Sequence, residues 1–477
     1  MKKLTIIASI VALLFLFSAC EDKDGENSGT GNWLKVNTFI AEYVSYYYLW
    51  NNEIASKIKQ PNAATNPHDY FNSLLYNNEH WSYLTDDVNA LHDYMNAVGE
   101  TFGYDLSFAL LNDGETVIAF VNYVYPNSPA DKAGVIRGDV IVLRNDEFLT
   151  VDNYTGVFDN GTQELTLAML SNGELLPRGT VRLTSERMPQ NPVLMCKVIR
   201  QGNHKIGYLM YTSFVSNFNP QLKESLTYLK NQGITDLVLD LRYNSGGEEE
   251  ATVLLCSAIA PKSIANESNI LITSEWNDKC MADIRELIEE DDSYEQLLTT
   301  RFEITSCNLD LPNNRVFVLT GENSASASEV VIVGLQPYMD VIQIGEPTVG
   351  KYTGMIGFEP TVSNGKGGYK TDPEIANWYM LLVVSKYMNI HGFTDFADGL
   401  TPNYPVKDNP FVSDLGHEDE PLLAKALSLI TGNANPSLKN STASPFMTHG
   451  MKKLHLKKHA LRDNYIQKLP NVNVLMR

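Results

Sequence analysis

Residues 320–351 read TGENSASASEVVIVGLQPYMDVIQIGEPTVGK, and this stretch decides the fold. A β-branched strand at Arg315–Leu319 leads into an elbow of small residues, an apolar helix and a second strand at Val341–Ile344. Three serines alternate with alanine at the point where the helix begins. The pattern therefore predicts a strand–turn–helix–strand unit with hydroxyl groups at a helix N-terminus.

A helix N-terminus suits acyl-transfer chemistry because its unpaired N–H groups and its dipole favour negative charge. Such an enzyme needs a nucleophile and a site for the oxyanion that it generates. The ordinary alternative is a serine-rich helix cap. Against that alternative, Lys351 lies in the apolar run IGEPTVGKY. A serine paired with a neutral lysine can hydrolyse an acyl bond without histidine, so we expect a Ser–Lys pair.

The two motifs SASASE and GEPTVGK resemble those of the C-terminal processing (tail-specific) peptidases, a Ser–Lys family. In that pattern the middle serine, Ser326, is the nucleophile, and Lys351, 25 residues later, is the general base. A second block, LVLDLRYNSGG at Leu237–Gly247, resembles the family motif DLRxNxGG, whose glycine amide helps to form the oxyanion hole. The resemblance covers roughly residues 90 to 430 and implies a serine endopeptidase that acts on exported proteins or peptides.

The resemblance also assigns the groups around the dyad. The oxyanion donors would be the N–H of Ala327 and that of Gly246 or Gly247. A lysine that works as a base near neutrality needs a pKa about 3 units below its usual value of about 10.4, or about 4 kcal/mol, which burial can supply.

Family members usually carry glutamine four residues after the lysine, and Met355 stands at that place. We therefore expect Thr353 or Tyr352 to orient the amine. We also expect Glu329 to face Arg242 across the two motifs.

The predicted fold class is α/β. Strands and helices alternate through the catalytic region, which indicates a parallel sheet covered by helices. The resemblance implies a crotonase-like catalytic domain, preceded by a PDZ-like β-rich domain and a small N-terminal helical domain. The predicted division is a signal peptide at 1–20, a flexible linker at 21–32, the helical domain at 33–87, the PDZ-like domain at 88–187, the catalytic domain at 188–432 and a basic tail at 433–477.

The segment Val117–Glu147 carries the resemblance to a PDZ domain, a module that binds peptide ends by adding them as a strand to a sheet edge. The peptide-binding loop would be Gly103, Tyr104, Asp105 and Leu106. Because Asp105 would repel a carboxylate, we expect weak selectivity for free C-termini.

The N-terminus resembles a bacterial lipoprotein signal. Two lysines precede the apolar run Leu4–Phe17, and small residues then lead to Cys20. Lipidation of Cys20 would anchor an exported protein to the membrane, and an uncleaved anchor is the alternative.

Composition excludes several classes of function. A net charge of −20 argues against nucleic acid or an anionic membrane surface as the main partner. No Cys/His spacing indicates zinc, and no cofactor is implied. Export permits disulfides, and Cys280 with Cys307 is the favoured pair. The alternative for all four cysteines after Cys20 is a free buried thiol, which we prefer for Cys256.

The last 45 residues hold eight Lys/Arg and one acid, so residues 1–432 carry −27. This tail would be either a basic membrane helix or, as we favour, a helix or arm docked on the acidic body.

Two other functions stay open on the same fold. One is a catalytically weak or inactive lipoprotein that binds peptides or apolar ligands. The other is a Ser–His–Asp hydrolase, although none of the nine histidines lies in a motif. The distance between Ser326 and Lys351 separates the peptidase from the binding protein. A hydrogen-bond separation favours the peptidase, whereas a lysine that is turned into solvent or paired with Glu346 favours the binding protein.

Overall fold

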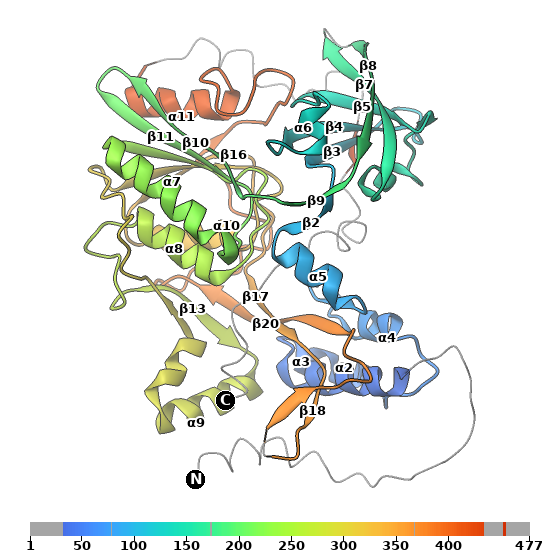
Figure 1. The fold of residues 1–477 in the computed structure, drawn as a ribbon. Helices are drawn as coiled ribbons and strands as arrows, with labels where there is room; N and C mark the ends of the chain where they lie inside the picture. The colour runs from blue at the N-terminus through green and yellow to red at the C-terminus, as the bar shows by residue number, and fades with distance from the viewer. Residues whose placement is uncertain (1–31, 78, 172–173, 367, 434–451, 455–477) are drawn as a thin grey trace.

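A computed structural model describes residues 32–77, 79–171, 174–366, 368–433 and 452–454. In the described residues, three large β-sheets, two small two-stranded sheets and flanking helices make a mixed α/β fold (Figure 1). The signal peptide, Cys20 and nearly all of the linker lie outside the described residues. Among the described residues, no helix is long and apolar enough to cross a membrane.

The central layer is a six-stranded sheet in the order β10-β11-β12-β15-β16-β21. Its strands are β10 (Val193–Gln201), β11 (His204–Tyr211), β12 (Asp236–Asp240), β15 (Arg315–Thr320), β16 (Asp340–Gly345) and β21 (Tyr404–Pro405). Neighbours from β11 to β21 are parallel, and β10 pairs antiparallel at the edge. The parallel sheet that the alternation predicted is therefore present.

Helices cover both faces of this sheet because its strands are apolar on both sides. Along β12, Leu237 and Leu239 belong to the core under three helices, and Val238 belongs to the core under a fourth. The three are α7 (Asn219–Gln232), α8 (Glu249–Ile259) and α10 (Ala327–Leu335), and the fourth is α11 (Pro421–Thr431). All nine residues of α10 are buried, which explains its almost uniformly apolar sequence.

A second sheet lies below the central layer and joins distant parts of the chain. Its strands are β1 (Tyr83–Thr85), β20 (Tyr379–Met388), β13 (Ile270–Trp276) and β14 (Thr299–Arg301), with β17 (Thr353–Phe358) paired to β20. The helices around it are α2 (Trp33–Tyr47), α3 (Asn51–Ile54), α4 (Pro67–Leu74) and α9 (Asp278–Glu290). A short 3-10 helix at Asp292–Leu297 and the hairpin of β18 (Thr361–Ser363) with β19 (Tyr369–Thr371) complete this region.

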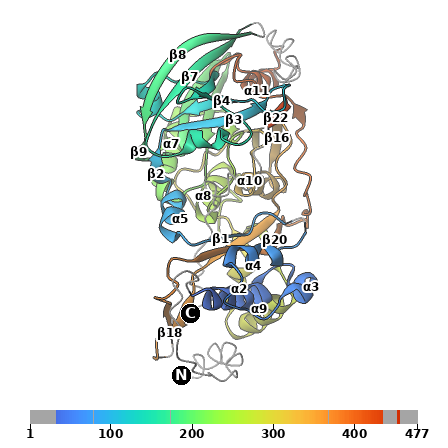
Figure 2. The same cartoon turned by 90° about the vertical axis from the view of Figure 1, so that its right-hand side faces the viewer.

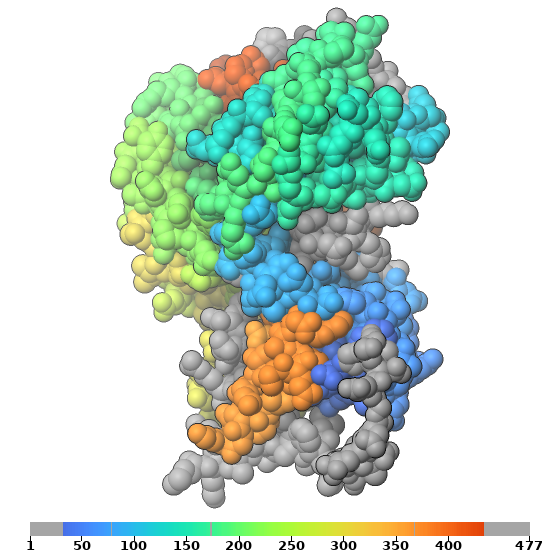
Figure 3. Space-filling view, turned by 45° about the vertical axis from the view of Figure 1, so that its right-hand side comes forward, coloured from blue at the N-terminus to red at the C-terminus, as the bar shows by residue number. Residues whose placement is uncertain are grey.

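The N-terminal helices share one hydrophobic core with this second sheet. Val36, Ile40 and Val44 of α2 pack in the same cluster as Met380 and Leu382 of β20. Figure 3 shows the orange segment that contains β20 against the blue N-terminal helices. The predicted helical region is real, but it gains its core from strands more than 300 residues later.

The β-rich unit is a sheet in the order β22-β3-β4-β5-β7-β8, with β6 on β5. Its elements are β3 (Tyr104–Leu110), β4 (Val117–Val124), α6 (Pro129–Lys132), β5 (Asp139–Arg144), β6 (Glu147–Phe148), β7 (Thr162–Ser171), β8 (Glu174–Thr184) and β22 (Lys452–Leu454). The chain enters through α5 (Val88–Met95) and β2 (Val98–Thr101), and it leaves through β9 (Glu186–Pro189), which pairs with β2.

The expected disulfide is absent, because all four described cysteines are free. Cys280 belongs to the core of the second sheet, whereas Cys307 belongs to the core of the central sheet. The prediction failed because the two cysteines, although both lie in the segment 261–314 that is inserted between α8 and β15, enter different cores.

Candidate active site

Ser326 stands at the sharp turn between β15 and α10. Its φ of +54° lies in the left-handed region, which is uncommon for a residue with a side chain and frequent at functional sites. The flanking serines are fully buried anchors: Ser324 Oγ donates to Leu241 O and Ser328 Oγ donates to Asn244 O, both at 2.8 Å. Two of the three alternating serines thus bind the DLRYNSGG block, and the middle one lines a cavity.

One carboxylate ties the serine elbow to the lysine. Glu329 Oε2 accepts the N–H of Ser326 at 2.7 Å and the N–H of Lys351 at 2.9 Å. Its other oxygen accepts the Thr348 hydroxyl at 2.6 Å and the Gly350 N–H at 2.7 Å. Burial raises the pKa of this carboxyl, and the four hydrogen bonds oppose that rise. A single carboxylate oxygen, Glu329 Oε2, therefore accepts hydrogen bonds from the backbone N–H groups of both Ser326 and Lys351.

The expected contact of Glu329 with Arg242 is wrong. The Arg242 guanidinium is fully buried and bonds Asp240, both oxygens of Glu420, and Asp408. The sequence held the signal for the true role, since Ser326-x-x-Glu329 has the spacing of a capping box, in which the glutamate reaches back to the cap N–H.

Lys351 is buried, with 2% of its surface exposed. Its Nζ lies 3.1 Å from Met355 Sδ and 5.2 Å from the centre of the Trp81 ring. Burial lowers the pKa of the amine to about 7, against the opposing charges of Glu79 and Glu329. A base with this pKa is largely neutral in mildly alkaline water, which the proposed chemistry requires.

The two residues expected to orient the amine behave differently. Thr353 lines the cavity, and its hydroxyl is buried without a hydrogen-bond partner. Tyr352 contributes its carbonyl, which accepts the N–H of Tyr387, while its ring packs on Phe396. Thr353 thus has a free hydroxyl at the site, and Tyr352 has a structural contact.

Tyr387 adds a second tie between the motifs. Its hydroxyl lies 2.8 Å from Lys351 O and 3.3 Å from Ser326 O. Neither Tyr387 nor Trp81 belongs to a motif, and they lie 36 residues after and 270 residues before Lys351. No signal in the sequence marks them, because only the second sheet brings them to the lysine.

The two glycines of the DLRYNSGG turn are distinguished by their hydrogen bonds. The Gly246 N–H donates to Asn244 Oδ1 at 2.8 Å, whereas Gly247 lines the cavity beside Ser326 and Ala327. A Cβ on Gly246 would lie 2.8 Å from Ser326 Cβ and 3.1 Å from Ala327 N, so this turn touches the elbow directly. The Gly246 N–H is therefore already engaged by a side chain, and Gly247 and Ala327 are the residues of the predicted oxyanion hole that line the cavity.

A cavity of about 640 Å³ opens at Ser326 and Lys351. Apolar residues that include Val330 and Met355 line it together with these two residues. Residues between Leu271 and Arg301 also line the cavity, and several of them are polar or charged. A cavity of this size, lined by both apolar and polar groups, is large enough for part of a peptide.

The predicted peptide-binding loop lies in the β-rich unit, apart from this cavity. Gly103 has a φ of +81° and no room for a Cβ against Ser128, and Tyr104 is buried. Asp105 accepts a hydrogen bond from Asn122 Nδ2 at 2.6 Å, and Leu106 is buried in the core of the unit.

Within the described residues, no cluster of His, Cys, Asp and Glu could hold a metal ion.

Comparison with known proteins identifies the family. A model of peptidase family S41 matches residues 205–406, and one of the peptidase S41 N-terminal domain matches residues 35–83. The chain belongs to peptidase family S41, a family of serine peptidases.

The curated relatives are C-terminal processing enzymes. The chain is 26% identical over 332 residues to carboxyl-terminal-processing peptidase 2, chloroplastic, of Arabidopsis thaliana, over 64% of this chain and 53% of that protein. It is 24% identical to the carboxyl-terminal-processing protease of Synechocystis, over 67% of both chains. The chain therefore spans about half the length of the plant relative.

A solved structure from Bacteroides fragilis, assigned to the S41 proteases, has the same fold. Its TM-score is 0.66 at 23% identity, and the match covers 87% of this chain and all of that one.

Proposed function

We propose that the protein is a serine endopeptidase of the C-terminal processing type, with Ser326 as nucleophile and Lys351 as general base. The observation that carries this proposal is the pair of hydrogen bonds from both backbones to Glu329 Oε2, beside a buried amine whose pKa is about 7. A protein that only binds ligands has no need of a desolvated lysine, which costs about 4 kcal/mol.

In the proposed hydrolysis of a peptide bond, Ser326 and Lys351 carry out the chemical steps and two backbone amides stabilise the intermediate. Neutral Lys351 takes the proton of Ser326 Oγ, and Oγ attacks the scissile carbonyl carbon. The N–H groups of Ala327 and Gly247 bind the oxyanion of the tetrahedral intermediate. When the C–N bond breaks, the lysine ammonium gives its proton to the leaving amine. Lys351, neutral again, then takes a proton from a water molecule whose oxygen attacks the acyl carbon. The bond between that carbon and Ser326 Oγ breaks, and the lysine ammonium returns the proton to Oγ, so the acid product leaves and the enzyme is restored.

The architecture supports finer assignments. We assign the central sheet with α7, α8, α10 and α11 to a crotonase-like catalytic domain at 188–432. We assign residues 88–187 to a PDZ-like domain that binds peptides through Gly103–Leu106. Thr353, with its unpaired hydroxyl, would position the amine or an attacking water.

The substrates would be proteins or peptides, in keeping with the names of the relatives. We further propose that lipidation of Cys20 anchors an exported protein to the bacterial envelope. A Cys20→Ser variant should leave the membrane fraction or persist as an uncleaved precursor. A mature wild-type protein without lipid would contradict the anchor.

The dyad is tested with variants and a fluorophosphonate probe. Ser326→Ala and Lys351→Ala should each abolish peptide hydrolysis, and Ser326→Ala should abolish labelling. The double variant should be no worse than either single one, because the two groups act as a unit. Circular dichroism on each variant checks that it is folded. Substantial turnover by Lys351→Ala would remove lysine as the base.

A further inference from the structure

A short strand from the basic tail lies on the edge of the β-rich sheet. β22 pairs antiparallel with β3, with Lys452 opposite Leu110, Lys453 opposite Ala109 and Leu454 opposite Phe108. Figure 2 shows β22 beside β3 at the outer side of this unit. The tail thus contacts the sheet through main-chain pairing, which is sensitive to backbone geometry more than to side-chain identity.

Without β22, β3 would be an edge strand. In the order β22-β3-β4, the opposite side of β3 is already bonded to β4. An uncovered edge presents a row of unpaired N–H and C=O groups, which readily accept another extended chain. β3 also begins in the loop Gly103–Leu106, so the tail covers the strand that follows the proposed peptide-binding loop.

Charge favours this occupant. The tail carries eight Lys/Arg and one acid, against −27 on residues 1–432. The turn after β3 contains Asp113 and Glu115, and β22 begins opposite Leu110, three residues before Asp113. Attraction between a basic arm and an acidic body raises the effective concentration of the arm at this edge, in addition to the covalent tether.

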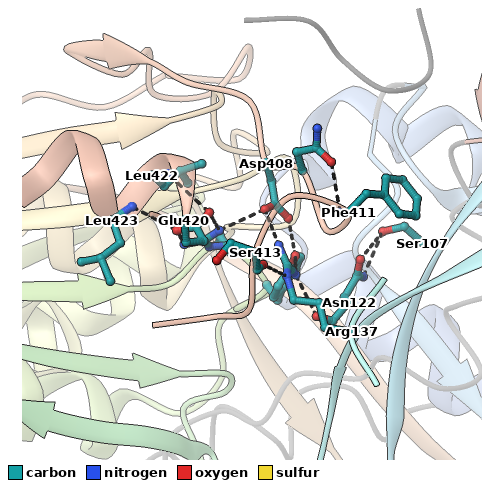
Figure 4. Close-up of polar contacts among 12 residues, drawn as sticks. Ser107, Asn122, Arg137, Asp408, Phe411, Ser413, Glu420, Leu422 and Leu423 are labelled. Atoms are coloured by element: carbon teal, nitrogen blue, oxygen red, sulfur yellow. Dashed lines mark hydrogen bonds and ion pairs between the residues drawn. The ribbon is translucent and has the colours of Figure 1, made fainter. Parts of the chain in front are cut away.

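The covered strand is also connected to the catalytic motif. Asn122 of β4 donates from Nδ2 to Asp105 and to the Ser107 hydroxyl of β3, and its carbonyl accepts Arg137 Nη1 at 2.8 Å. Arg137 Nη2 bonds Asp408 Oδ1 at 2.7 Å. Arg242 Nη1 bonds the same oxygen at 3.0 Å. Figure 4 shows Asn122, Arg137 and Asp408 within this series of contacts. A continuous polar chain therefore runs from the β3 edge to the DLRYNSGG block.

We propose that Lys452–Leu454 is a built-in strand ligand that occupies the β3 edge and excludes external peptides from it. The occupant is this segment of the chain itself, added by antiparallel pairing. An external extended peptide must displace it before it can add to β3. The docking is independent of the proposed peptidase activity, and only its consequence for substrate capture rests on that activity.

Hydrogen exchange tests the docking on the full chain. The variant Lys453→Pro/Leu454→Pro removes both N–H groups, and one of the two must face β3 because hydrogen-bonded pairs alternate along an antiparallel ladder. The two prolines therefore disrupt the pairing whichever of these residues donates. The control Thr442→Pro/Ala443→Pro places the same residues elsewhere in the tail. In the first variant, amides of β3 should exchange roughly tenfold faster or more, with β5 and β7 unchanged. In the control, β3 should match wild type. Equal β3 protection in wild type and both variants would overturn the proposal.

Peptide binding tests the exclusion. The probe is a labelled peptide with the sequence of residues 449–458, HGMKKLHLKK, and its partner probe has proline at the two positions of 453 and 454. The first probe should bind Lys453→Pro/Leu454→Pro at least roughly tenfold more tightly than wild type, and more weakly as salt rises. Equal affinity of the probe for wild type and variant would overturn the exclusion. Neither assay measures hydrolysis, so an inactive dyad would leave both results interpretable.

Discussion

The acidity of Lys351 can be changed through its neighbour Met355, whose sulfur lies 3.1 Å from Nζ. Met355→Glu would place a carboxylate beside the amine, and Met355→Gln would place a neutral group of nearly the same shape. Two unit charges about 4 Å apart attract by about 4 kcal/mol at an effective dielectric constant of about 20. This energy corresponds to about 3 pKa units, so the glutamate should move the lysine pKa from about 7 to about 10.

The rate should follow the neutral fraction of the amine. Wild type should lose activity as the pH falls through about 7, because a protonated lysine cannot accept the serine proton. Met355→Glu should be slower by on the order of 100-fold at pH about 7.5 and should recover as the pH rises toward about 10. Met355→Gln should keep the acid limb near that of wild type.

The assay is kcat/KM for one peptide substrate across the pH range, measured in parallel on the three proteins. Fluorophosphonate labelling rates provide a second readout of the serine. A shared acid limb for the Glu and Gln variants would refute the reasoning, because it would show that the ionisation of Lys351 does not limit the rate.

Four other changes test separate parts of the structure. Lys351→Met should raise the free energy of unfolding by about 3 kcal/mol at pH about 8, because the buried lysine must lose a proton that it keeps when unfolded. This gain should shrink as the pH rises toward 10.5, and urea titrations showing no gain would mean that the amine is hydrated. Gly246→Ala should reduce kcat by roughly 100-fold or more in a folded protein, since its Cβ would lie 2.8 Å from the Ser326 Cβ, and a wild-type kcat would contradict the turn geometry. Asp408→Asn should lower the free energy of unfolding by about 3 kcal/mol, because two buried arginines lose their shared carboxylate, and an unchanged urea midpoint would show that this network is not stabilising. Wild type should cut free and amidated C-terminal peptides about equally, and Asp105→Gly should favour the free acid; a strong wild-type preference for the free acid would show that Asp105 does not face the bound carboxylate.

Local sequence was sufficient to place the two strands on either side of the serine-rich turn. The expected strand at Arg315–Leu319 is β15 with one more residue, and the expected strand at Val341–Ile344 is β16 with one more at each end. These predictions hold because hydrophobic runs and small-residue turns depend on neighbouring residues of the chain. The local sequence Ser326-x-x-Glu329 also has the spacing of a capping box, which indicates that Glu329 bonds the Ser326 N–H. We had instead predicted a contact between Glu329 and Arg242.

The tertiary structure alone determines the contacts between residues that lie far apart in the chain. Trp81 over the Lys351 amine, the Gly246 N–H committed to Asn244, and the strand Lys452–Leu454 on β3 all depend on how separate sheets meet. The prediction of a disulfide between Cys280 and Cys307 failed for the same reason, because distant strands determine which core each cysteine enters. Sequence periodicity reports which face of an element is buried but not which partner buries it. The pKa of the lysine, which depends on those partners, therefore belongs to the folded chain.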